Sequence, residues 1–180
     1  DPHVPATMDE AVAAGSAADA AWRCSLEPFA ASSPVPEASG AAWWSIDDKP
    51  ALVVVSDSGD NGAYAIVDPD TGATLEQGAL PLGEGASDDL EGLASHGDRL
   101  YGLTSSGWMR AWRREGTGWA LVDGPYPIGP VDPKLGGHGN RPPAGDGMVC
   151  DGPKVNCGRN YEGLALAAHA PDGACAGFAA

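Results

Sequence analysis

The six-residue stretch Asp89-Leu90-Glu91-Gly92-Leu93-Ala94 recurs along the chain. Related versions are Glu37-Ala38-Ser39-Gly40-Ala41-Ala42 before it and Asn160-Tyr161-Glu162-Gly163-Leu164-Ala165 after it. We call this stretch the signature, and we call each signature with the residues that follow it a unit. Three units in one chain indicate an internally repeated fold.

Short apolar runs separated by turn residues follow each signature. The first unit predicts strands over 41–46, 52–56, 63–67 and 73–80, with Asn61-Gly62 as a hairpin signal. The second unit predicts them over 93–95, 99–104, 108–113 and 119–122, and the third over 164–168 and 175–180. Four strands joined by tight turns are typical of one β-propeller blade. We therefore expect an all-β fold of about two and a half such blades over 37–180, with an insertion at about 125–159.

Composition and charge exclude several classes of protein. The chain has 180 residues, with 10 basic and 25 acidic side chains and a net charge of −15. A nucleic-acid binder or a polybasic membrane-surface protein needs an excess of basic over acidic side chains, so both classes are excluded. Glycine and proline number 26 and 16, a load that suits turn-rich β structure better than long helices. No apolar run approaches the roughly 20 residues of a membrane span.

Residues 1–36 differ in composition from the rest. Thr7-Met8-Asp9-Glu10 resembles a helix start, and good helix formers follow to Trp22, so a helix is predicted over about 8–22. The alternative is a flexible Ala-rich tail. The Pro- and Ser-containing stretch 32–36 is interpreted as a linker.

The four cysteines favour an exported protein. Cys150 and Cys157 are spaced for a small disulfide ring, and Cys24 with Cys175 is a possible second pair. The alternative is four reduced, buried thiols, and no ligand spacing typical of zinc accompanies them. Disulfides would place the protein outside the cell or in the periplasm.

The signatures resemble those of the phytase-like esterase family and of related SdiA-regulated-type β-propeller proteins, over residues 37–180. The resemblance implies a propeller with its active or ligand site at a central tunnel, often with calcium. Two departures are evident: Ser39 stands where the other signatures have Glu, and the family needs more blades to close a ring.

The signature carboxylates are the candidate site residues. Glu91 and Glu162 are predicted to line the tunnel as metal ligands or catalytic general bases, or else to bond backbone groups at the strand starts. Asp89 is a further candidate ligand, or a residue that caps a turn. Asp57 and Asp60 lie in a loop that resembles a calcium loop but lacks its distal Glu, and that also reads as a plain hairpin turn. Oxygen ligands of this kind favour Ca²⁺ or Mg²⁺ over zinc.

The third unit stops at the point that corresponds to Ser58 and Ser106 in the earlier units. A strand cut there leaves backbone groups unpaired, so we expect a second polypeptide, produced by proteolytic processing, to complete the propeller as a heterodimer. The resulting expectation is an exported, calcium-dependent esterase or phosphoesterase acting on a small molecule. The alternatives are a non-catalytic propeller that binds or scaffolds, and an autoprocessed hydrolase whose nucleophile is the N-terminal Ser or Thr of the second chain.

Overall fold

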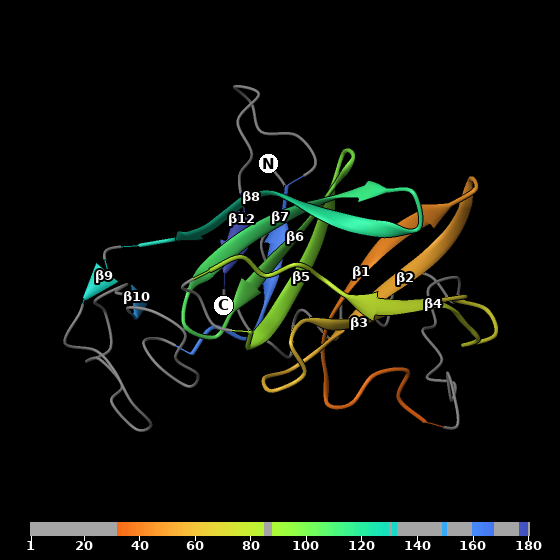
Figure 1. Ribbon diagram of the computed structural model, residues 1–180, viewed down its shortest axis with the longest axis horizontal. Coiled ribbons are helices and arrows are strands. Elements are labelled where there is room, and N and C mark those ends of the chain that lie inside the picture. The colour runs from red at the N-terminus through yellow and green to blue at the C-terminus, as the bar shows by residue number, and fades with distance from the viewer. Residues whose placement is uncertain are drawn as a thin grey trace, which may run out of the picture.

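The computed structural model describes residues 32–84, 88–129, 131–132, 149–150, 160–167 and 177–179. These residues form two four-stranded antiparallel sheets and two short strand pairs, without a helix (Figure 1). The all-β prediction is therefore confirmed for this part of the chain. The predicted helix over 8–22 lies outside it, as do Cys24, Cys157, Cys175 and the side chain of Cys150.

The first unit folds as an up-and-down sheet in the order β1-β2-β3-β4. The strands are β1 (Ala38–Ile46), β2 (Lys49–Ser56), β3 (Ala63–Val67) and β4 (Thr74–Ala79). The turn before β3 contains Asn61 and Gly62 with φ of 52° and 75°, as its Asn-Gly pair predicts. β1 ends at Ile46 as predicted but begins earlier, at Ala38, and β2 begins earlier than predicted because Lys49 pairs directly with Ile46.

The second unit repeats this order as β5-β6-β7-β8. The strands are β5 (Leu90–His96), β6 (Arg99–Thr104), β7 (Trp108–Glu115) and β8 (Gly118–Pro127). β8 is longer than predicted, because pairing with β7 continues beyond two register shifts to Trp108 opposite Pro127. The short pairs are β9 (Val131–Asp132) with β10 (Val149–Cys150), and β11 (Leu164–Leu166) with β12 (Gly177–Ala179).

Equivalent hydrogen bonds show that the two full units share one construction. The Asp57 N–H donates to the Glu37 carbonyl at 3.0 Å, and the Ser105 N–H donates to the Asp89 carbonyl at the same distance. At the other edge of each sheet, the Leu80 N–H donates to the Gly62 carbonyl at 2.9 Å, and the Ile128 N–H donates to the Gly107 carbonyl at 3.0 Å. The repeat of the sequence is thus a repeat of backbone geometry.

The main core lies between the two sheets. The first sheet contributes Val53, Val55 and Ile66, and the second contributes Leu100 and Trp112, all fully buried. Burying side chains of this size is the largest favourable term available to the fold.

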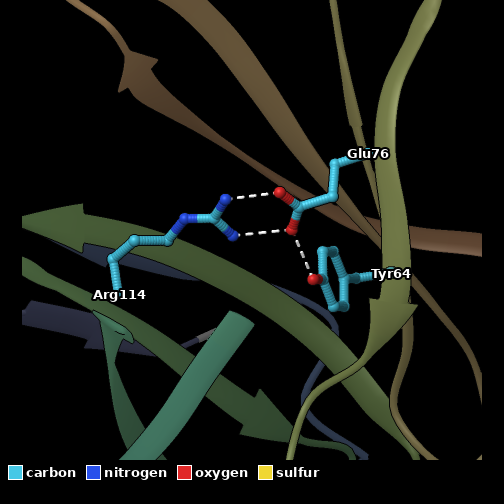
Figure 2. Close-up of polar contacts among 3 residues, drawn as sticks. All are labelled: Tyr64, Glu76 and Arg114. Carbon is cyan, nitrogen blue, oxygen red and sulfur yellow. Dashed lines mark hydrogen bonds and ion pairs between the residues drawn. The ribbon is translucent and has the colours of Figure 1, made fainter. Parts of the chain in front are cut away.

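A polar contact also joins the sheets. Arg114 on β7 donates through Nη1 to Glu76 Oε1 on β4 at 2.6 Å and pairs with the second carboxylate oxygen through Nη2 (Figure 2). The Tyr64 hydroxyl on β3 donates to Glu76 Oε1 at 2.6 Å. Arg114 also lies over the Trp119 ring at 5.4 Å. Burial, followed by the hydrogen bond to Glu76, raises the pKa of Tyr64 to about 12.

The opening strands β1, β5 and β11 lie side by side, with β5 in the middle. A Cβ atom at Gly40 would lie 3.2 Å from the Leu93 nitrogen, and one at Gly92 would lie 2.6 Å from the Leu164 nitrogen. The signature glycines therefore permit close approach of neighbouring opening strands at these two positions. The described sheets do not close into a ring, and a complete propeller remains a prediction. Within the described residues, no helix is long and apolar enough to cross a membrane.

Candidate metal centre

Glu91 occupies a β-bulge at the start of β5. Leu90 pairs with Thr104 and Gly92 with Leu103, so Glu91 is the extra residue in the ladder. The equivalent Ser39 is the extra residue between Ala38 and Gly40. A bulge turns its side chain away from the regular alternation of a strand and often does so beside functional sites. In both full units, the third residue of the signature is thus presented from a bulge.

Three carboxylates converge at this bulge. Asp57 follows the last residue of β2, Asp89 precedes β5, and Glu91 lies one residue inside β5. One oxygen from each lies within 4.8 Å of the others. Asp89 is buried, whereas Asp57 and Glu91 are half-buried, so the group is open to solvent on one side. The site joins the first unit, through Asp57, to the second.

Ser105 holds Asp89 in place. Its hydroxyl donates to Asp89 Oδ2, its N–H donates to the Asp89 carbonyl, and its side chain is fully buried. The Ser105 carbonyl in turn accepts from the Tyr161 N–H at 2.9 Å, within the third signature. Sequence reasoning missed this supporting role. The available signal was that Ser105 occupies the position of Asp57 in the aligned units.

The electrostatics of the cluster are those of crowded like charges. Burial, together with the negative charges of Asp57, Asp89 and Glu162 in that order, raises the pKa of Glu91 to about 7. The carboxyl group therefore exchanges its proton near neutral pH, or loses it when a cation enters the site. This combination of geometry and pKa is common in functional clusters.

The remaining predicted site residues lie at the margin. Glu162 is exposed and accepts a hydrogen bond from the Asn160 amide, yet its charge reaches Glu91. Asp60 accepts a hydrogen bond from the Ser56 hydroxyl within the turn after β2 and is not a member of the three-carboxylate group. Of the five predicted ligands, the structure thus brings Asp57, Asp89 and Glu91 together.

The donor set fits a hard divalent cation. Ca²⁺ takes about six to eight oxygen ligands from carboxylates, carbonyls and water, in flexible geometry. Three convergent carboxylates offer that chemistry, and among the residues that the structure describes no nitrogen or sulfur donor of the kind that zinc prefers belongs to the group.

No protein-family model, curated protein or solved structure matches the chain. The resemblance of its signatures to those of phytase-like esterases therefore stays a prediction. A fold alone does not determine a function, which depends on the chemistry of the site.

Proposed function

We propose that this protein binds a divalent cation, Ca²⁺ by the nature of the donors, at Asp57, Asp89 and Glu91, and hydrolyses an ester or phosphoester there. The observation that carries the proposal is the convergence of three carboxylates at the bulge, with the pKa of Glu91 raised to about 7. A bound cation would neutralise the cluster and polarise a carbonyl or phosphoryl oxygen.

The chain's own residues divide the remaining work. Asp89 is the positioned ligand, because Ser105 fixes both its carboxylate and its backbone carbonyl. Glu91 holds or accepts a proton near neutral pH in the metal-free site, and it would give up that proton to become a ligand when the cation binds. Glu162, which precedes the neighbouring opening strand β11, is the acid–base candidate.

A phosphoester substrate would depend on the cation for its charge balance. Arg110 is buried and its Nε donates to the Leu82 carbonyl at 2.7 Å, while Arg114 pairs with Glu76. Both side chains thus serve the packing of the sheets. Carbonyl esters, which carry no phosphate charge, are accordingly the first substrates to test.

Calorimetric titration with CaCl₂ tests the cation, and turnover of p-nitrophenyl acetate and p-nitrophenyl phosphate, with calcium or with EDTA, tests the reaction. Glu91→Gln and Asp57→Asn should each weaken calcium binding and calcium-dependent turnover at least tenfold. Glu115→Gln is the matched control, because Glu115 is the exposed last residue of β7 and does not belong to the three-carboxylate group. Equal binding by all four proteins would overturn the proposal.

The same assays separate the alternatives. Calcium binding without turnover on a broad ester panel would favour a binding or scaffold module. Turnover that survives EDTA but stops with a Ser- or Thr-directed reagent would favour an autoprocessed hydrolase. Export and the disulfides that suggest it remain predictions, tested by the intact mass of the native protein before and after reduction.

A further inference from the structure

The turn after β2, residues 57–62, is bonded to the neighbouring unit. The N–H groups of Gly59 and Asn61 both donate to Asp88 Oδ2, at 3.2 and 3.4 Å. Asp88 immediately precedes Asp89, the first residue of the second signature. Two consecutive aspartates of the second unit thus have different contacts: Asp88 bonds the turn of the first unit, and the Asp89 carboxylate lies in the candidate metal centre.

This turn is longer than its equivalent between β6 and β7. The shorter turn is closed within its own unit, because the Thr104 hydroxyl accepts a hydrogen bond from the Trp108 N–H at 3.0 Å. In the longer turn, the equivalent hydroxyl of Ser56 bonds the Asp60 side chain instead. Asp88 adds a second anchor to the longer turn, and this anchor comes from the other unit.

The same turn carries Asp57, the one carboxylate that the first unit contributes to the centre. The Asp57 N–H donates to the Glu37 carbonyl at 3.0 Å, which fixes its backbone within the first unit. Its side chain, however, has to meet Asp89 and Glu91 of the second unit. The bonds to Asp88 hold the turn against the second unit beside this meeting point. Hydrogen bonds from outside a ligand set commonly orient the ligands of metal sites in this way.

Asp88 also has an electrostatic relationship with Arg110. Burial lowers the pKa of Arg110 to about 10, and the negative charge of Asp88 acts in the opposite direction. Loss of Asp88 would therefore remove both an acceptor for the turn and a charge near a buried guanidinium. Asp88→Asn separates these two roles, because an amide oxygen accepts the same hydrogen bonds without the charge.

We infer that Asp88 is a positioning residue for the cation site: it holds the turn after β2 against the second unit and so places the Asp57 carboxylate beside Asp89 and Glu91. This inference rests on the proposed function, because it assigns Asp57 as a ligand. Asp88 acts through Asp57 and does not itself contact the cation.

Calorimetric titration of the full chain with CaCl₂ tests this inference. Asp88→Ala should weaken calcium binding roughly tenfold, as loss of an outer-shell bond does at other metal sites. Asp88→Asn should stay close to the wild type, and so should the control Asp70→Ala, which makes the same change at an exposed turn. The double variant Asp57→Asn/Asp88→Ala should bind no more weakly than Asp57→Asn alone, because both changes remove one ligand. Additive losses in the double variant, or equal losses in Asp88→Asn and Asp88→Ala, would overturn the inference.

Amide hydrogen exchange in EDTA provides a readout without the cation. The amides of Gly59 and Asn61 should exchange faster in Asp88→Ala than in the wild type, Asp88→Asn or Asp70→Ala. Unchanged exchange in Asp88→Ala would overturn the inference even if calcium binds to the wild type. Faster exchange in Asp88→Ala, with no calcium binding by the wild type, would support the hold of Asp88 on the turn and overturn only the proposed function.

Discussion

Arg114 on β7 and Glu76 on β4 form a two-pronged ion pair across the boundary between the sheets, with both side chains mostly buried. Removing Arg114 leaves the Glu76 carboxylate mostly buried with only the Tyr64 hydroxyl as a donor, which costs more than the pair contributes. We expect Arg114→Met to lower the free energy of unfolding by roughly 2 kcal/mol and Tyr64→Phe by about 1 kcal/mol. Urea unfolding monitored by tryptophan fluorescence measures both.

The double variant distinguishes a network from two separate contacts. Because Tyr64 and Arg114 both bond Glu76, their effects should be non-additive by at least 0.5 kcal/mol, a threshold of about the size that marks coupling. The pKa of Glu76 is lowered, chiefly by the hydrogen bonds from Arg114. The contribution of this network is therefore present above the ordinary carboxyl pKa of 4.5 and is lost as the pH falls through the lowered value. Purely additive effects would contradict the network.

The signature glycines should differ in their tolerance of a methyl group. Gly92→Ala places Cβ 2.6 Å from the Leu164 nitrogen, so the strands must separate, at a cost of about 1–3 kcal/mol. Gly40→Ala, with its nearest neighbours at 3.2 Å, should cost less. Gly163→Ala should cost the least, because no described atom lies within 4 Å of its Cβ position. Differential scanning calorimetry of the three variants gives the order, and equal effects at positions 92 and 163 would contradict the strand contact.

Glu91 should destabilise the metal-free protein at neutral and higher pH. Its folded pKa of about 7 exceeds the ordinary value of 4.5, so the folded state holds the proton more tightly. The wild type therefore loses stability as the pH rises from 4.5 to 7, and Glu91→Gln removes that loss. We expect the variant to melt at a higher temperature than the wild type at pH 8 in EDTA, and with calcium the order should reverse. A variant less stable at every pH in EDTA would show that Glu91 has a structural role instead.

Calcium affinity should depend on pH through the same group. A cation competes with the proton on Glu91, so binding should weaken by roughly tenfold per pH unit below pH 7 and level off above it. Calorimetry at pH 6.5 in buffers of different ionisation enthalpy should show proton release on binding. Pairing Glu91→Gln with the Glu115→Gln control assigns that proton, because only the former should abolish its release.

The sequence predicted the strands well because the turns are chemically explicit. The Asn61-Gly62 pair specified the start of β3, and the prediction of β3 over 63–67 is confirmed without adjustment. β8 was underestimated because its second half contains Gly124 and Pro125, residues that usually end a strand, and a register shift accommodates them. Helix and disulfide predictions fall outside the described residues.

The candidate site was predicted in its residue types and only partly in its arrangement. Asp89 and Glu91 followed from the signature, whereas Asp57 was assigned to a calcium loop with Asp60, and the structure separates those two. The bulge at Glu91 leaves no mark in one sequence, because it is a property of pairing with β6. The Arg114–Glu76 contact was equally invisible, since it depends on how one sheet is placed on another.

The bulge has a consequence for how such a site can evolve. Ser39 and Glu91 stand at the same extra position of two duplicated units, yet Ser39 donates a hydrogen bond to the Leu90 carbonyl and Glu91 joins the carboxylate cluster. A residue outside the regular ladder can be replaced without disturbing the strand pairs on either side. A single substitution at the bulge position can therefore replace a structural hydrogen bond with an acidic group. Such substitutions change the charge of the candidate metal centre one residue at a time, while the pairing of the strands is preserved.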